Sequence, residues 1–334
     1  MRFLPARSGL PRRSFENITT WEGVHTVEVE ELYKSLRPSL ISLAYRMMGS
    51  MMDAEDIVQE TFLSIEKVPS EMVRNPKSYL FRSVSNRCID RLRAQSKHRE
   101  AYVGPWLPEP IMSEGNGPID PLEGYIRKET ISMAYLLLIQ QLSWTERVVF
   151  LLREVLQYEY EEIAEIVDKS PTNCRQIFRR AKRSLGEIPQ VNVGMERETT
   201  HVIEQFAQAL LSGDMKILLE TLTSDTILYM DGGGKVKAPL RPLYGHDRIA
   251  RFFIGIFPEF PADFTFQLCE MNAQPGLVFY AGEQLFATIS FDIQNNRIVN
   301  MYAVLNPDKL KSVLRSGVPL ISSLYEIIPH NQKL

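Results

Sequence analysis

The chain of 334 residues is long enough for two or three domains, and its 44% hydrophobic and 24% charged residues are usual for a globular protein. A formal net charge of −3 excludes nucleic-acid binding through an overall basic balance, so a surface of this kind would need segregated charge. Cys88, Cys174 and Cys269 lie far apart without CxxC spacing, which argues against a disulfide framework and a zinc site and fits a reducing cytosol.

Residues 1–26 are expected to form a disordered extension, or to result from an upstream translation start that was chosen wrongly. They contain four arginines, but no apolar stretch follows, so they do not have the pattern of a secretory signal. No apolar run approaches the ~20 residues of a membrane span. We therefore expect a cytoplasmic protein that makes no membrane contact.

Three amphipathic helices are expected in the first third of the chain. Apolar residues recur at helical spacing over Val27–Met48, then after Asp53, a plausible N-cap, and again over Tyr79–Leu92. Residues 53–66 contain acids and no base, whereas residues 74–99 contain eight lysines and arginines and one acid. An acidic helix followed by a basic one suggests two partners of opposite charge.

A segment rich in proline and glycine, residues 101–128, follows these helices and is predicted to be a linker. Residues 129–188 are expected to be helical again. Within them, Ser143 and Glu146 have the spacing of a helix capping box.

The stretch Tyr160–Leu185 has the pattern of a helix-turn-helix. A short helix with Ile163, Ala164 and Val167 on its apolar face is followed by Pro171, which suits the first position of a second helix. The outer face of the second helix is basic and rich in amides, and it carries Thr172, Asn173, Arg175, Gln176, Arg179, Arg180 and Arg183. Arginine can pair with guanine, and Asn or Gln with adenine, in the major groove. This composition favours DNA binding over a helical hairpin whose polar face is merely solvated.

An α+β domain is expected over residues 197–312, with residues 313–334 as a tail. Two helices are predicted over Val202–Leu211 and Met215–Leu222, and Asn295-Asn296 has the composition of a hairpin turn. Strand-like runs cover Thr226–Met230, Phe264–Met271, Leu277–Tyr280, Gln284–Asp292 and Ile298–Leu305. Helices followed by an antiparallel meander are typical of this class.

Three segments, in this order and spacing, resemble regions 2 and 4 of the extracytoplasmic-function (ECF) sigma factors of bacterial RNA polymerase. They read DAEDIVQETFLSI at 53–65, NPKSYLFRSVSNRCIDRLR at 75–93, and LSWTERVVFLLREVLQYEYEEIAEIVDKSPTNCRQIFRRAKRSL at 142–185. Further segments resemble the subgroup with a fused carboxy-terminal domain similar to the SnoaL and NTF2-like cone folds. These segments are YVGPWLPEP at 102–110, DGGGK at 231–235 and NPDKL at 306–310. The resemblance implies a multidomain protein with an all-α region 2 bundle at 27–100, an all-α region 4 with its helix-turn-helix, and an α+β cone.

The resemblance also implies roles for particular side chains. Polymerase binding is expected for the acidic helix, through Asp56, Gln59 and Glu60. Minus-ten promoter contacts are expected for Lys77, Arg82, Asn86, Arg87 and Arg91, because cations can hold a strand whose bases have left the stack. Minus-thirty-five contacts are expected for Thr172, Asn173, Arg175, Gln176, Arg179 and Arg180. The alternative for the acidic helix is a solvated face, and for Tyr79 and Phe81 it is core packing.

The cone domain is predicted to dock on the linker or on region 2 and so to make a regulatory interdomain contact. This contact would join Trp106, Leu107 and Pro108 to Asp231, Gly232, Gly233, Gly234 and Lys235. Three successive glycines suit a strand end where the backbone approaches a neighbour closely or adopts a positive φ. Trp106 is a large apolar group in a polar linker, so we expect it to fill a pocket.

We thus expect a promoter-specificity subunit whose partners are core RNA polymerase, at its clamp and flap, and promoter DNA. No cofactor, metal or catalytic residue is expected, and a small molecule is a further candidate ligand of the cone domain. One rival is a cone-fold enzyme that uses Tyr229, Asp231, His246 and Asp247 for proton transfer. Another is a ligand-sensing repressor that binds DNA without polymerase, although such a protein needs neither residues 53–66 nor residues 75–93.

Overall fold

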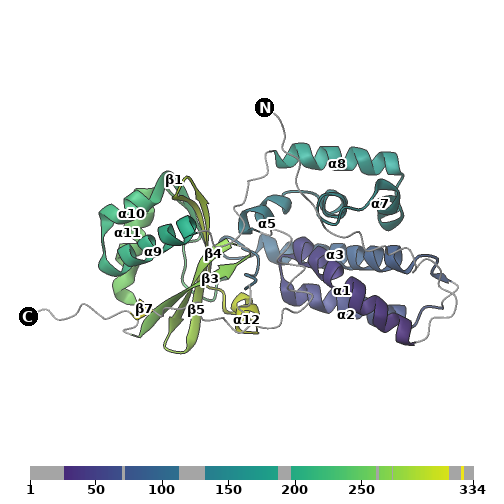
Figure 1. Ribbon diagram of the computed structural model, residues 1–334, viewed down its shortest axis with the longest axis horizontal. Coiled ribbons are helices and arrows are strands. Elements are labelled where there is room, and N and C mark those ends of the chain that lie inside the picture. The colour runs from purple at the N-terminus through teal and green to yellow at the C-terminus, as the bar shows by residue number, and fades with distance from the viewer. Residues whose placement is uncertain are drawn as a thin grey trace, which may run out of the picture.

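The computed structural model describes residues 26–69, 72–112, 132–186, 197–260, 263–272, 274–315 and 325–326. The predictions for the amino-terminal extension, most of the linker and most of the tail fall outside these residues. Two bodies lie side by side, a helical one and one built on a sheet, and α5 and α12 lie between them (Figure 1).

The first three helices form a bundle. They are α1 (Thr26–Met48), α2 (Met51–Ile65) and α3 (Pro76–Glu100). The predicted N-cap of the second helix is wrong by one turn: the Ser50 hydroxyl caps α2 by accepting a hydrogen bond from the Asp53 N–H at 3.1 Å. The reason lies one residue earlier, because Gly49 has a φ of +71° that ends α1 and lets the next helix begin at once. Asp53 therefore lies in the first turn, where a negative charge is favourable.

The helix-turn-helix forms as predicted, within a second group of helices. These are α5 (Met133–Ile139), α6 (Trp144–Phe150), the π-helix η2 (Leu151–Val155), α7 (Tyr160–Val167) and α8 (Pro171–Leu185). Ser170 caps α8 through the Asn173 N–H at 3.2 Å, and Pro171 is its first residue. Asp168 ends α7 in the left-handed conformation, with a φ of +55°. Ile163 and Ala164 are buried as expected, Val167 is partly buried against the same core, and Ile166, which the pattern did not single out, is fully buried beside them.

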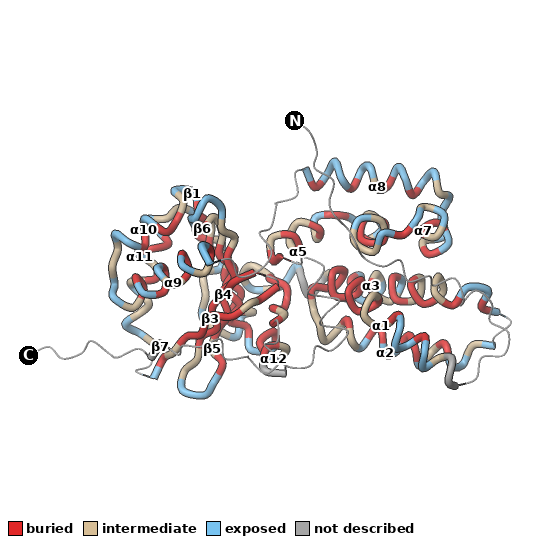
Figure 2. The backbone as a smooth tube through the Cα atoms, in the orientation of Figure 1, coloured by how far each residue is buried: buried red, intermediate tan, exposed pale blue. Residues whose placement is uncertain are grey.

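The two helical groups share one hydrophobic core, visible as the buried inner faces in Figure 2. Arg147 of α6 lies inside it with 3% exposure. Its guanidinium donates to the Met47 carbonyl at 2.7 Å and to the Gln140 carbonyl at 2.8 Å. Because Met47 is in the last turn of α1, whose carbonyls have no partner within the helix, Arg147 caps this helix and ties the two groups together.

The carboxy-terminal body is a curved sheet in the order β2-β1-β6-β5-β4-β3-β7, and β1 and β6 form its parallel pair. The strands are β1 (Leu222–Asp231), β2 (Leu243–Tyr244), β3 (Phe264–Met271), β4 (Gln274–Ala281), β5 (Gln284–Gln294), β6 (Arg297–Val304) and β7 (Tyr325–Glu326). The helices are α9 (Arg197–Ser212), α10 (Met215–Thr221), α11 (His246–Ile256), the 3₁₀ turn η3 (Phe257–Glu259) and α12 (Pro307–Arg315). The predicted hairpin turn is confirmed, because Asn295 and Asn296 both have positive φ between β5 and β6.

The two faces of the sheet pack against different partners. Helices α9, α10 and α11 cover one face and share a core with it. Leu107 and Met112 of the linker, Met133 of α5 and two residues of α12 pack on the other face. The sheet thus separates the core of the carboxy-terminal body from an apolar junction with the rest of the chain. No helix in the described part of the chain combines the length and hydropathy needed to cross a membrane.

Candidate nucleic-acid interface and interdomain junction

The outer face of α8 is open to solvent. Every residue predicted to contact the upstream promoter element is exposed: Thr172, Asn173, Arg175, Gln176, Arg179 and Arg180. Arg175 forms an ion pair with Glu161 at 3.1 Å, and Arg180 forms one with Glu146. Within the described residues Arg179 makes no ion pair. The outer face of α8 can therefore approach a DNA groove without breaking any contact in the hydrophobic core.

The acidic face of α2 is also open, with Asp56, Gln59 and Glu60 all exposed. Glu60 accepts a hydrogen bond from Arg87 of α3 at 3.0 Å, and the same guanidinium donates to Ser64 at 2.6 Å. The structure thus joins one residue of the predicted polymerase surface to one of the predicted minus-ten surface.

The cations of α3 pair with acids of the helix-turn-helix and of α2. Lys77 pairs with Glu162 at 3.3 Å, and Arg82 pairs with Asp168 at 3.0 Å. Arg91 pairs with Asp53 at 3.3 Å. These predicted DNA-binding cations therefore face carboxylates in this conformation, whereas Asn86 is exposed. Ion pairs this accessible stabilise a structure by about 0–1 kcal/mol each, so a polyanion could displace them.

At the junction, the carboxylate of Asp231 is fully buried and holds the linker. Oδ1 accepts a hydrogen bond from the Tyr102 hydroxyl at 2.6 Å, and Oδ2 accepts one from the Leu107 N–H at 2.8 Å. Lys309 of α12 pairs with the same Oδ2 at 2.6 Å and also donates to the Leu107 carbonyl. Strand alternation along β1 explains why Asp231 faces the linker, because Tyr229 lies on the same outer face.

The glycines after Asp231 let the linker approach the backbone. Gly233 and Gly234 have φ of +60° and +70°, as the sequence pattern led us to expect. A Cβ atom on Gly233 would lie 2.2 Å from Nδ2 of Asn306 and 3.1 Å from the Tyr102 hydroxyl. Lys235 forms an exposed ion pair with Asp308 of α12.

Trp106 fills the space next to the α1–α3 bundle. Its ring lies so close to Gly49 that a Cβ atom there would be 2.5 Å away, and the Lys309 ammonium is 4.0 Å from the ring centroid. Pro108 is buried beside it. Of the predicted interdomain set, Asp231 contacts Leu107 directly, and Gly233 and Gly234 lie against Tyr102 and Val103 of the linker. Trp106 instead contacts Gly49 and Lys309, and Lys235 contacts Asp308.

Three further residues complete the junction and escaped the sequence analysis. Glu109 is buried, its Oε2 accepts the Met51 N–H at 2.7 Å, and burial raises the pKa of its carboxyl against the lowering effect of such hydrogen bonds. The Tyr45 hydroxyl donates to the Glu109 carbonyl at 2.8 Å and accepts from Asn272 at 3.1 Å. The first bundle, the linker and the sheet therefore meet at the hydroxyl of Tyr45. A local sequence pattern could not predict these contacts, because the residues are far apart in the sequence.

Among the described residues, those of the enzyme hypothesis do not line the cavity of the carboxy-terminal body. The cone domain contains a cavity of about 570 Å³, and Tyr229, Asp231, His246 and Asp247 are absent from its lining. Tyr229 stacks on Tyr302 on the opposite face of the sheet, and Asp247 pairs with Arg251 on the surface. No cluster of His, Cys, Asp and Glu suited to a metal ion occurs among the described residues.

Comparison with known proteins decides the family. Family models for Sigma-70 region 2 and Sigma-70, region 4 match residues 32–98 and 132–185. The chain is 30% identical over 306 residues to the ECF RNA polymerase sigma factor SigJ of Mycobacterium tuberculosis. The aligned residues cover 88% of this chain and 95% of the relative. The chain belongs to the ECF sigma factors.

Other comparisons agree with this assignment. The probable ECF sigma factor SigI of Mycobacterium tuberculosis is 25% identical over 299 residues, 86% of this chain and 98% of the relative. The crystal structure of SigJ superposes with a TM-score of 0.66 at 25% identity, over 85% of this chain and 98% of that structure. The α1–α3 bundle is thus sigma region 2, α5–α8 form region 4, and the sheet body is a SnoaL-like cone. An ECF sigma factor binds core RNA polymerase and promoter DNA.

Proposed function

We propose that region 2 contacts the polymerase clamp through Asp56, Gln59 and Glu60, and that region 4 contacts the flap. The exposed acidic face of α2 supports the first contact, since complementary charge speeds and orients association. We further propose that the basic face of α3 holds the opened minus-ten element and that α8 reads the minus-thirty-five element. The exposure of Arg179, which makes no ion pair within the described residues, supports the role of α8.

We propose that the SnoaL-like cone regulates this sigma core from within the same chain. The buried Asp231 carries the proposal, because it binds the linker that runs from region 2 toward region 4. A tethered regulator acts at a high effective concentration and needs no separate inhibitor. Regions 2 and 4 must span two promoter elements at once, so holding the linker on the cone restrains their separation.

The packing of region 4 on region 2 suggests what must be released. Lys77 and Arg82 cannot hold DNA while Glu162 and Asp168 occupy them. We infer that productive binding separates α3 from α7, and that loss of the junction makes this separation easier. We also infer that the cone domain acts by binding and not by catalysis, since the four candidate proton-transfer residues lie away from its cavity.

The test is run-off transcription with core polymerase and full-length protein. Asp231→Asn should raise transcription severalfold, because it removes the charge that holds Lys309 and the linker. Asp308→Asn is the matched control, since it breaks an exposed pair between the same glycine turn and α12. Equal transcription by the parent and both variants would exclude regulation through this junction. Co-purification of the parent and both variants with core polymerase tests the sigma function separately.

A further inference from the structure

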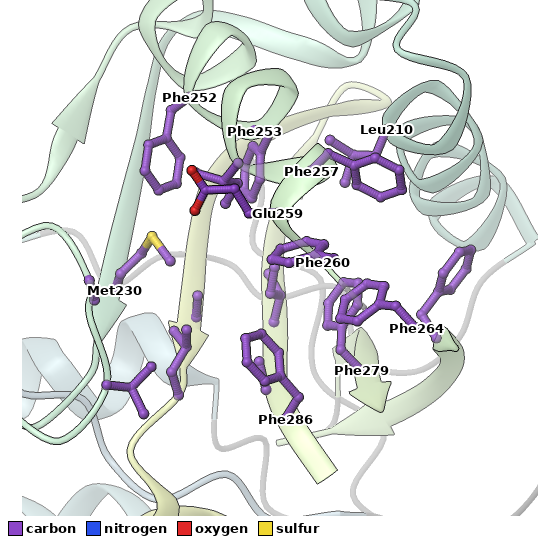
Figure 3. A pocket seen from close by; sticks show the side chains of 18 of the residues that line it. Leu210, Met230, Phe252, Phe253, Phe257, Glu259, Phe260, Phe264, Phe279 and Phe286 are labelled. Atoms are coloured by element: carbon purple, nitrogen blue, oxygen red, sulfur yellow. The ribbon is translucent and has the colours of Figure 1, made fainter. Parts of the chain in front are cut away.

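The SnoaL-like cone contains an apolar cavity of about 570 Å³ between its sheet and helices α9 and α11. Figure 3 shows aromatic side chains from α11, η3 and the sheet facing this space, among them Phe252, Phe257, Phe260, Phe264, Phe279 and Phe286. Of the residues described around it, Lys237 and Glu259 are the charged ones, and both are exposed. Cavities of about 300–1,000 Å³ with mainly apolar and aromatic walls are the usual sites of small ligands.

The lining restricts the chemistry of an occupant. An ion buried among the phenylalanines would have no counter-charge, and burying an unpaired charge is costly. Lys237 and Glu259 have opposite charges and are exposed, so they give no net preference to an anion or a cation. The walls suit an uncharged molecule that is largely apolar, such as a ring system with few polar atoms.

One wall of the cavity belongs to the junction. Val236–Pro239 lines the cavity and follows the glycine turn at residues 232–234 after one intervening residue, Lys235. On its other side this loop meets the linker, because a Cβ atom on Gly104 would lie 3.8 Å from the Pro239 carbonyl oxygen. Met230 also lines the cavity and is the neighbour of Asp231. A molecule in the cavity and the linker outside it therefore contact opposite sides of the same short loop.

We propose that the cavity binds an uncharged, largely apolar small molecule, and that its binding stabilises the junction between loop 236–239 and the linker. The ligand would contact the loop in the position seen here, so it favours this position over others. The second half rests on the proposed regulatory role of the junction, whereas the first half does not. By linkage, a ligand that stabilises the junction is itself bound more tightly while the junction is intact.

The binding test uses Nile red, an uncharged apolar fluorophore, and the full-length protein. We expect saturable binding that weakens by at least about tenfold in Ala287→Phe, which fills the cavity from β5. Ala101→Phe makes the same change at an exposed position outside the cone and should bind like the parent. If Ala287→Phe does not fold, Phe257→Ala at the half-exposed rim should weaken binding instead. Absence of saturable binding, or equal binding by the filled variant, overturns the site.

The coupling test measures amide hydrogen exchange of linker residues 105–112 with and without saturating Nile red. Exchange should slow by about fivefold or more, and Asp231→Asn should weaken Nile red binding by a similar factor. Unchanged exchange and unchanged affinity overturn the coupling, even if Asp231→Asn alters transcription. A chain ending at Arg315 should bind Nile red like the parent. Much tighter binding by that chain would mean that residues 316–334 are the occupant, and it would overturn the small-molecule proposal.

Discussion

Removing the charge of Asp231 should open the junction far more than its single position suggests. The side chain of Asp231 is 0% exposed and the side chain of its partner Lys309 is 9% exposed, so neither the carboxylate nor the ammonium can be rehydrated in place. Breaking a buried ion pair by removing one partner costs about 3–5 kcal/mol, because the other charge stays buried. Since 1.4 kcal/mol is tenfold, Asp231→Ala should raise the open fraction of the junction by roughly a hundredfold to several thousandfold.

Hydrogen exchange of the Glu109 and Asn272 amides measures this opening. These N–H groups donate to the carbonyls of Gly49 and Ile111, at 2.8 Å each, and neither contacts Asp231. Faster exchange therefore reports an open junction and not the loss of an acceptor. Asp308→Ala is the control: its pair with Lys235 is about half exposed, so the expected cost is about 0–1 kcal/mol.

A double-mutant cycle makes the reasoning refutable. Lys309→Met combined with Asp231→Ala removes both buried charges. The double variant should therefore lower the free energy of junction opening by about 1.5 kcal/mol or more less than the sum of the two single changes. Additive effects, or an Asp231→Ala change no larger than the Asp308→Ala change, would show that the buried charges do not hold the junction.

Three further outcomes are expected. Asp56→Lys with Glu60→Lys should weaken binding to core polymerase at least tenfold by competition assay while the melting temperature changes little, because both side chains are exposed; normal competition would mean that the face is only solvated. Arg179→Ala should weaken promoter binding by about 1–3 kcal/mol and relax base preference at one position, as a binding assay on substituted promoters would detect, whereas an even loss would indicate a phosphate contact. Burial raises the pKa of Asp292 above its ordinary 3.8, so the folded state holds its proton more tightly, and stability should fall as the pH rises through and above this value. Asp292→Asn should flatten that fall in urea unfolding between about pH 4 and about pH 7, and an unchanged slope would contradict the assignment.

The sequence predicted what depends on local pattern. Pro171 is the first residue of α8, and the five predicted strands all form, with β3 at its predicted bounds. Helix α11 was missed, because glycines and prolines surround a segment whose helix is stabilised by packing on β1 and α10. Tertiary burial overrides local propensity in such segments.

The packing of region 4 on region 2 was not predicted, although the sequence contained a signal for it. Glu162 and Asp168 are the acids that face the basic helix α3. Charge segregation in the sequence was interpreted as evidence of outside partners. Charge segregation is equally consistent with a partner surface within the same chain, and charge alone cannot distinguish an internal partner from an external one. No sequence pattern indicated the contact between Tyr45, Glu109 and Asn272, because these residues belong to three segments that are far apart in the sequence.

The order of synthesis determines when the junction can form. Residues that Asp231 and Lys309 hold, such as Leu107, are synthesised long before Lys309 itself. About 200 residues separate them, and at about 5–20 residues per second their synthesis lasts roughly 10–40 seconds. Regions 2 and 4 are complete during most of this interval, while α12 does not yet exist. On the regulation proposed above, each new molecule passes through an unrestrained stage on the ribosome, and the restraint forms only once the last part of the cone has been made.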